Sequence, residues 1–183
     1  MRTTKTIRHG KHNKNTVVFG IVAASLLMLC IDTAGLTPTI FAQKILNNRF
    51  NAKLSGTNEV PPLTSAGSGV ASFQLVSMGH QEAINYELNL QNMKGVTGAH
   101  IHSGKQGENG PVVAGLFNPS MSGPPTGTIN GLLTAGTLTS SQLTGPLAGK
   151  TVDSLVNMIK SGDAYVNVHT AQNQNGEVRG QIS

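Results

Sequence analysis

The sequence predicts an all-β protein: a Greek-key antiparallel β-sandwich or barrel of about eight or nine strands, with one short crossover helix. Three observations lead to this class. The 183 residues include 22 glycines, while aromatic residues make up only 4% and tryptophan is absent. Short segments alternate apolar and polar residues. A single segment near the C-terminal end has helical spacing instead. These features indicate one turn-rich domain and disfavour a helical bundle.

The alternating segments predict the strands in chain order, because successive side chains of a strand point to opposite faces. Glycine, proline and asparagine lie between the segments and predict the turns that separate the strands. The expected strands cover residues 50–54, 71–75, 84–90, 98–103, 112–117, 126–130, 135–139, 164–170 and 177–182.

The crossover helix is expected between Thr151 and Gly162. Thr151 is a candidate N-cap, and Gly162 is the type of residue that ends a helix. The apolar residues between them recur at helical spacing and are expected to face the core; they are Val152, Leu155, Val156 and Ile159.

Residues 1–42 have the order of a targeting segment, either a cleaved signal peptide or an uncleaved signal anchor. A basic region precedes the uninterrupted apolar run of residues 17–31, and cleavage is expected after Ala42. In the alternative, residues 17–41 anchor the chain in the membrane. Residues 43–48 would then be a short linker, and residues 49–183 the folded domain. Both alternatives place the domain outside the cytoplasm, secreted or on the outer face of the cytoplasmic membrane.

The positive charge of the chain belongs to this leader. Residues 1–42 contain five Lys/Arg and one Asp, a net +4, whereas residues 43–183 contain eight Lys/Arg and seven Asp/Glu, a net +1. The expected domain therefore offers no basic surface for nucleic acid. The only cysteine is Cys30, inside the apolar run, so the domain forms no internal disulfide.

Three ordered blocks resemble the signature blocks of the CHRD domain family, named for chordin. They are LSGTNEVPPLTSAGSGVASFQL (residues 54–75), GAHIHSGKQGENGPVV (98–113) and AYVNVHTAQNQNGEVRGQI (164–182). The resemblance implies an exported all-β module of undefined role. With no catalytic constellation in the sequence, it favours a non-enzymatic function in adhesion, or in binding an unknown extracellular or envelope partner, with membrane contact only through an uncleaved leader.

The histidines suggest a different function. His100 and His102 project from the same face of a strand, about 6.6 Å apart at Cα, and His169 lies on the corresponding polar face of a later strand. Three imidazoles from two strands suit a surface-mounted site for copper or zinc with an open coordination position.

A weaker likeness points the same way. An H-x-H strand, a glycine-rich loop and a later V-x-H strand are similar to the copper-ligand arrangement of copper/zinc superoxide dismutases, which implies His100, His102 and His169 as ligands and redox chemistry at copper. No further histidine between Gly104 and Val168 could supply the zinc subsite of those enzymes.

In the alternative interpretation, the same histidines have a structural role and bind no metal. On this interpretation they hydrogen-bond to backbone groups of the neighbouring loops, which need partners. Several other residues are expected to shape or fix loops: Glu59, Gly104, Gly107, Gly110, Glu177 and Arg179. Glu177 and Arg179, two residues apart, are expected either to form an ion pair or to fix a neighbouring loop.

Overall fold

A computed structural model describes residues 48–123 and 125–183 of the chain. These residues form eight strands, two short α-helices and three 3-10 turns. The strands are β1 (Arg49–Ser55), β2 (Ser68–Met78), β3 (Gln81–Lys94), β4 (Val96–Ser103), β5 (Val112–Phe117), β6 (Thr128–Leu138), β7 (Ala164–Thr170) and β8 (Val178–Gln181). The helices are α2 (Pro119–Ser122) and α3 (Val152–Lys160); the turns are η1 (Gly56–Asn58), η2 (Ser140–Gln142) and η3 (Gly145–Leu147).

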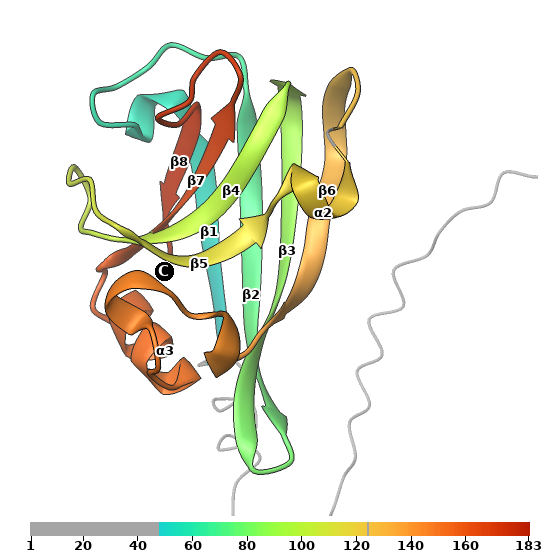
Figure 1. The fold of residues 1–183 in the computed structure, drawn as a ribbon. Helices are drawn as coiled ribbons and strands as arrows, with labels where there is room; N and C mark the ends of the chain where they lie inside the picture. Colours follow the sequence, from blue (N-terminus) through green and yellow to red (C-terminus); the bar gives the residue numbers. More distant parts are fainter. Residues whose placement is uncertain (1–47, 124) are drawn as a thin grey trace, which may run out of the picture. The chain divides into compact units, whose positions relative to one another are not determined.

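The eight strands form one antiparallel sheet in the order β5-β4-β7-β8-β1-β2-β3-β6. In Figure 1 the half made by β5, β4, β7 and β8 lies in front of the half made by β1, β2, β3 and β6. The hydroxyl of Tyr86 on β3 donates a hydrogen bond to the carbonyl of Leu116 on β5 at 2.8 Å, which links the two halves. The predicted all-β sandwich or barrel class is therefore confirmed.

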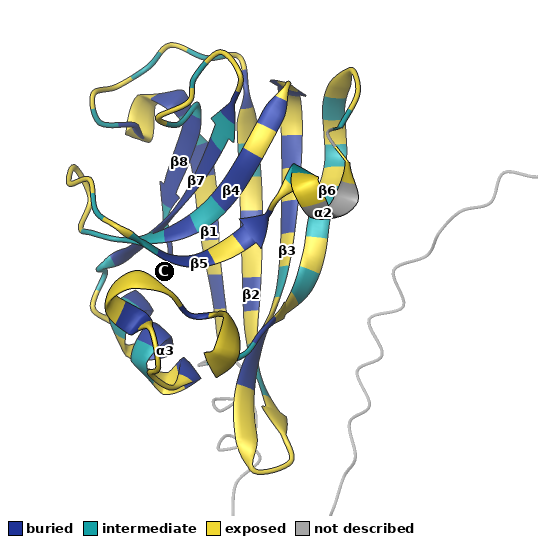
Figure 2. Ribbon diagram, viewed as in Figure 1, coloured by how far each residue is buried: buried dark blue, intermediate teal, exposed yellow. Residues whose placement is uncertain are grey.

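The core lies between the two halves of the sheet. Buried and exposed residues alternate along β1, β2 and β3, as the period of two predicts. Figure 2 shows the buried positions as dark bands across these strands, separated by exposed ones. The hydrophobic core joins both halves, with Leu88 and Leu90 from one and Ile101 and Val166 from the other, all fully buried.

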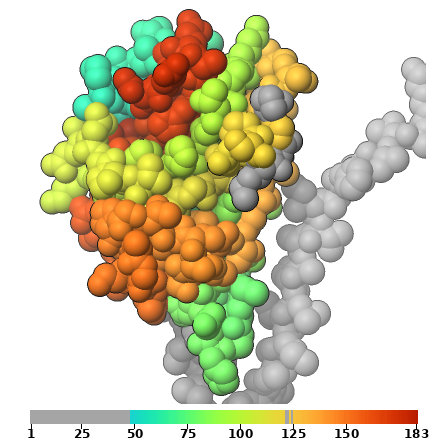
Figure 3. All heavy atoms as spheres, viewed as in Figure 1, coloured from blue at the N-terminus to red at the C-terminus, as the bar shows by residue number. Residues whose placement is uncertain are grey.

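Helix α3 forms where the sequence predicts the crossover helix. It begins after the N-cap Thr151 and buries all four of the expected apolar residues, including Leu155 with no exposed surface. The helix packs against β3 and β7. In Figure 3 the 140–160 segment lies directly against the β4–β5 region, and the amide of Thr144 donates to the carbonyl of Val113 at 2.8 Å. The segment thus covers one end of the core.

The prediction of two separate strands within residues 126–139 is wrong. Residues 126–130 and 135–139 were expected as two strands, but Thr128–Leu138 forms the single strand β6. Gly131 directly follows the first expected strand, whereas in the structure it lies within β6 at a φ of 139°. The pairing of β6 with β3 shifts register nearby, between Leu88 and Asn89. The break in alternation reflects a β-bulge in a continuous strand.

Strands β7 and β8 differ from the others because both of their faces are buried. Their burial is nearly continuous, which Figure 2 shows as strands that are dark along most of their length. One face covers the core, and the polar face lies under the loops of residues 56–67 and 104–111. This polar face was expected to lie on the surface of the domain. Instead, the two loops cover it, so most of its side chains are buried.

The predicted leader, including residues 17–41, lies outside the described residues. Within residues 48–123 and 125–183, no helix has the length and apolar character needed to cross a membrane.

Candidate metal centre

The three histidines singled out from the sequence lie together. Strands β4 and β7 are antiparallel neighbours, in which Gly98 pairs with His169 and His100 pairs with Asn167. This register places His169 beside His100 on the polar face. One nitrogen from each of His100, His102 and His169 lies within 4.8 Å of the corresponding nitrogens of the other two. Ligands at about 2.0 to 2.1 Å from one ion are at most about 4.2 Å apart, so the cluster is close to the spacing that coordination requires.

Two of the rings are held by the loops beside them. Nδ1 of His102 lies 2.9 Å from the carbonyl oxygen of Gly110, and Nδ1 of His169 lies 2.9 Å from the carbonyl oxygen of Gln174. A carbonyl oxygen only accepts, so both Nδ1 atoms carry the proton and donate. In the neutral ring the lone pair is then on Nε2. Both Nε2 atoms are buried and have no hydrogen-bond partner among the described residues.

In His100 the buried nitrogen is Nδ1, whereas in His102 and His169 it is Nε2. This Nδ1 atom of His100 has no hydrogen-bond partner in the part of the chain that the structure describes. The His100 ring lies 5.1 Å from the His169 ring and 5.9 Å from the His102 ring. The ring lies over Gly98: a Cβ atom at that position would be 3.1 Å from Cε1 of His100. The absence of a side chain at residue 98 therefore makes room for the imidazole of residue 100.

The surroundings keep all three imidazoles neutral. Burial, with further contributions from His169 and His102, lowers the pKa of His100 from 6.5 to about 4. Burial also lowers the pKa of His102 and of His169, although their hydrogen bonds to loop carbonyls act in the opposite direction. Neutral imidazole is the form that binds metal ions.

An aromatic stack supports the ring of His102. The ring of Tyr165 lies 5.1 Å from the ring of His102 with an angle of 13° between the planes. The guanidinium of Arg179 lies over the same tyrosine, 3.4 Å from the ring centre. The tyrosine hydroxyl accepts a hydrogen bond from the amide of Gly110 at 3.1 Å. The stack therefore positions both His102 and the loop residue to which it donates.

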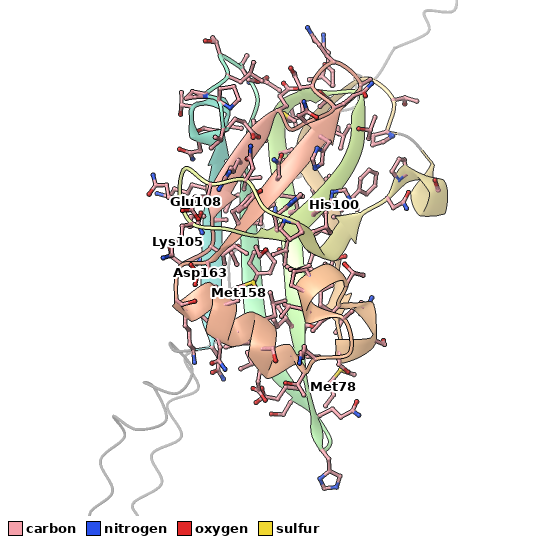
Figure 4. The ribbon with its side chains drawn as sticks, turned by 60° about the vertical axis from the view of Figure 1, so that its left-hand side comes forward. Met78, His100, Lys105, Glu108, Met158 and Asp163 are labelled. Carbon is pink, nitrogen blue, oxygen red and sulfur yellow. The ribbon has the colours of Figure 1, made fainter. Side chains whose placement is uncertain are left out.

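Arg179 holds the glycine loop, one of the two roles predicted for it. Its side chain is only 2% exposed and donates to the carbonyl oxygens of Lys105 and Glu108 at 2.9 and 2.7 Å. It also donates to Oδ1 of Asn109 at 3.2 Å. Figure 4 shows His100 on β4 and the two residues Lys105 and Glu108 in the loop that follows the strand. The loop passes so close to β4 that a Cβ on Gly110 would collide with the carbonyl of Ser103.

Gly104 and Gly107 are in the same loop and adopt positive φ angles of 149° and 85°. These are conformations that favour glycine, as expected of residues that shape a loop.

Glu177 fixes a different loop. Its carboxylate accepts hydrogen bonds from Ser65 at 2.8 Å, Thr170 at 2.7 Å and Asn173 at 3.1 Å. Burial alone would raise the pKa of Glu177, but these three donors outweigh it and the pKa is lowered. Of the two roles expected for Glu177 and Arg179, the structure thus displays loop fixing by each residue.

Glu59 lies on the buried polar face and accepts a hydrogen bond from Nδ2 of Asn167 at 3.3 Å. It is not part of the histidine cluster. Burial raises the pKa of Glu59 to about 7, although Arg179 and the hydrogen bond from Asn167 act to lower it. Glu59 therefore connects the loop after β1 to β7.

Three residues that shape the site were not predicted from the sequence to contribute to it: Gly98, Tyr165 and Asn167. Gly98 has a signal in the sequence, because it lies two residues before His100 and therefore on the same face of the strand. Tyr165 and Asn167 lie four and two residues before His169 and therefore on the same face of β7. Their partners come from β4, β8 and the loop after β1, and strand adjacency was needed to find them.

The donor set fits a transition metal. Three neutral rings each present a buried nitrogen without a partner, and two of the rings donate their other N–H to backbone carbonyls. Metal-binding histidines usually have such a second hydrogen bond, which fixes the tautomer and the orientation of the ring. His100, His102 and His169 could together hold one copper or zinc ion.

Comparison with known proteins gives one family. No curated protein and no solved structure matches the chain. The model of the CHRD domain matches residues 50–182, which include every strand core and the three histidines. The match covers most of the chain and agrees with the three sequence blocks that resemble this family. The chain belongs to the CHRD domain family.

Proposed function

We propose that this CHRD domain is a metal-binding module that holds one copper or zinc ion through His100, His102 and His169. One observation supports this best: three imidazoles gather in one cluster, and each has a buried nitrogen with no hydrogen-bond partner among the described residues. The donors would be Nδ1 of His100 and Nε2 of His102 and His169, since the loops occupy Nδ1 of the latter two.

A purely structural role leaves these nitrogens unexplained. Leaving a buried polar atom without a partner costs about 1 to 3 kcal/mol, and the cluster contains three such atoms. Hydrogen bonds to the loops account for one nitrogen on each of His102 and His169. An ion would provide a partner for the three buried nitrogens that lack one among the described residues.

The proposed location is outside the cytoplasm. It rests on the basic and apolar order of residues 1–42. The extracellular or envelope partner expected for a non-enzymatic module stays a prediction.

The direct test measures metal binding to the purified full chain. Elemental analysis and calorimetry with Zn²⁺ and Cu²⁺, and a chelator competition with Cu⁺ under anaerobic conditions, should give one equivalent of metal for the wild type. His100→Ala and His169→Ala should each weaken binding at least about 100-fold, since each removes one of three ligands. His80→Ala is the matched control, because His80 is exposed in the turn between β2 and β3.

Circular dichroism of each variant should report a folded β protein. The proposal is wrong if the wild type binds none of the three ions with a dissociation constant below about 10 μM, or if the two ligand variants bind as tightly as His80→Ala. Because the wild-type measurement decides the first point, the test does not depend on whether every variant folds.

A further inference from the structure

We infer that the ion held by the three histidines is monovalent copper, bound by three ligands. This inference rests on the proposed metal site and specifies the oxidation state and coordination number. Two independent features of the site support it: the charge around the cluster and the number of donors.

The donors bring no negative charge. The cluster consists of three histidines, and no carboxylate or thiolate of the described residues joins it. A divalent ion would therefore keep its full charge of +2 in a half-buried position. The free energy of placing an ion in a poorly solvated site rises steeply with its charge. Neutral donors consequently favour the ion with the single charge.

The side chain of Arg179 adds a positive charge near the cluster. Arg179 lies over Tyr165, which in turn stacks on His102. Only 2% of the Arg179 side chain is exposed, so water screens its charge poorly. Glu59 is the acidic residue of the same polar face, but its hydrogen-bond partner is Asn167 and it is outside the cluster. Arg179 thus places a positive charge near the cluster, which opposes a second positive charge on the ion, and Glu59 offsets part of this charge when it is ionised.

The number of donors gives the second argument. Zn²⁺ in proteins takes four ligands in a tetrahedron, and Cu²⁺ prefers a tetragonal arrangement. Cu⁺ has a filled d shell and is satisfied by three ligands in a plane. Here the described residues provide three donor nitrogens, all buried from water. The described residues therefore provide no fourth His, Cys, Asp or Glu ligand for an ion at this cluster.

The donors are also held in place. His102 is fixed by Gly110 on one side and by the Tyr165 stack on its face, while His169 is fixed by Gln174. Two donors held in this way resist the rearrangement that a tetragonal ion would require. The site is therefore expected to discriminate between oxidation states of copper.

The test compares affinities of the purified full chain for three ions. Cu⁺ is measured anaerobically against a bicinchoninate competitor, and Cu²⁺ and Zn²⁺ against nitrilotriacetate. We expect Cu⁺ to bind about 1,000-fold more tightly than either divalent ion. X-ray absorption of the Cu⁺ protein should show about three nitrogen ligands. A preference for Cu⁺ below about 100-fold, or a four-coordinate Cu⁺, overturns the inference.

A pair of variants isolates the contribution of charge. His169→Asp and His169→Ala both remove the same imidazole, but only the aspartate adds a negative charge to the cluster. The ratio of Cu⁺ to Cu²⁺ affinity should be at least about 10-fold lower in His169→Asp than in His169→Ala. His80→Asp places the same charge in the exposed β2–β3 turn and should leave the wild-type ratio unchanged. Equal ratios for the two His169 variants contradict the charge argument.

The failure of this inference is distinguishable from failure of the proposed function. If one Zn²⁺ or Cu²⁺ binds through the three histidines more tightly than Cu⁺, the metal site stands and the assignment to monovalent copper is wrong. If none of the three ions binds, both are wrong.

Discussion

His102 and His169 each use their two ring nitrogens differently. One nitrogen donates to a loop carbonyl, and the other is buried without a partner. The two interpretations of the sequence, loop fixing and metal binding, are therefore compatible for these residues. The hydrogen bond to the loop even favours metal binding, because it places the lone pair on Nε2, the buried nitrogen without a partner among the described residues.

Gly98 is predicted to be a positioning residue for His100. In Gly98→Ala the new Cβ would lie 3.1 Å from Cε1 of His100, closer than ordinary van der Waals contact, so the imidazole must move. We expect metal affinity to fall about 10-fold or more, as measured by chelator competition. Gly115→Ala is the matched control: Gly115 pairs with His100 from β5, and a Cβ there meets no atom within 4 Å. Equal losses in the two variants would contradict this role.

Glu59 is predicted to make stability depend on pH. Its pKa is raised from 4.5 to about 7 by burial, although Arg179 and Asn167 act to lower it. The folded state therefore binds more protons than the unfolded state between these values, and the contribution of Glu59 to stability is lost as pH rises through this window.

Glu59→Gln removes the titrating group. The free energy of unfolding of Glu59→Gln, minus that of the wild type, should become more positive from pH 4.5 to about 7 and stay level above it. Urea unfolding at four pH values measures the difference, which also cancels the opposite trend of the histidines. A difference that does not change with pH would contradict the prediction.

At the scale of elements, the distinctive feature is that β7 and β8 are covered on both faces. Loops 56–67 and 104–111 lie over the polar face and contact each other, since Nδ2 of Asn109 donates to the carbonyl of Val60 at 2.9 Å. Both loops are anchored to the strands by buried side chains, Glu59 to Asn167 and Arg179 to the glycine loop. The two loops thus pack over the polar face of β7 and β8, and β7 is the neighbour of β4 in the strand pair that carries the three histidines.

Arg179 is predicted to be the main anchor of the glycine loop. Arg179→Lys keeps the positive charge but cannot reach Lys105, Asn109 and Glu108 together, because it lacks the planar guanidinium. Losing part of these hydrogen bonds from a charged donor should lower the free energy of unfolding by about 2 kcal/mol. Urea unfolding measures the loss. Arg49→Lys, in the exposed first position of β1, should change stability by less than about 0.5 kcal/mol; a similar effect of both substitutions would be against the prediction.

Some elements could be predicted closely from the sequence. Strands 112–117 and 164–170 and helix α3 lie where the pattern places them, because each has local period and local end signals. Strand β6 was wrongly divided because Gly131 is compatible with a turn or with a bulge. Only the pairing of β6 with β3 decides between the two.

At the scale of the whole molecule, the three histidines join distant parts of the chain. His100 and His102 belong to β4, and His169 belongs to β7, more than 60 residues later. An ion bound by all three would link these strands only in the folded state. Metal binding is therefore expected to stabilise the entire domain.

The expected size follows from linkage. Free metal at 100 times its dissociation constant should add about 2.7 kcal/mol to the free energy of unfolding, seen as a rise in the melting temperature with metal concentration. The rise should be absent in His100→Ala and present in His80→Ala. A melting temperature that does not respond to saturating metal in the wild type would contradict the coupling.

The sequence by itself determined the all-β class, the crossover helix, most of the strands and the identity of the three candidate ligands, because these depend on local periodicity and on residue type. It could not determine that the polar face of β7 is an interior. Two loops distant in sequence cover that face, and their contacts with Asn167, Tyr165 and Arg179 exist only once the strands are paired. The tertiary structure also decided which nitrogen of each ring is free. The H-x-H pair became a three-histidine cluster because β4 and β7 are neighbours in the sheet, and neighbours in a sheet are set by the packing of the whole domain.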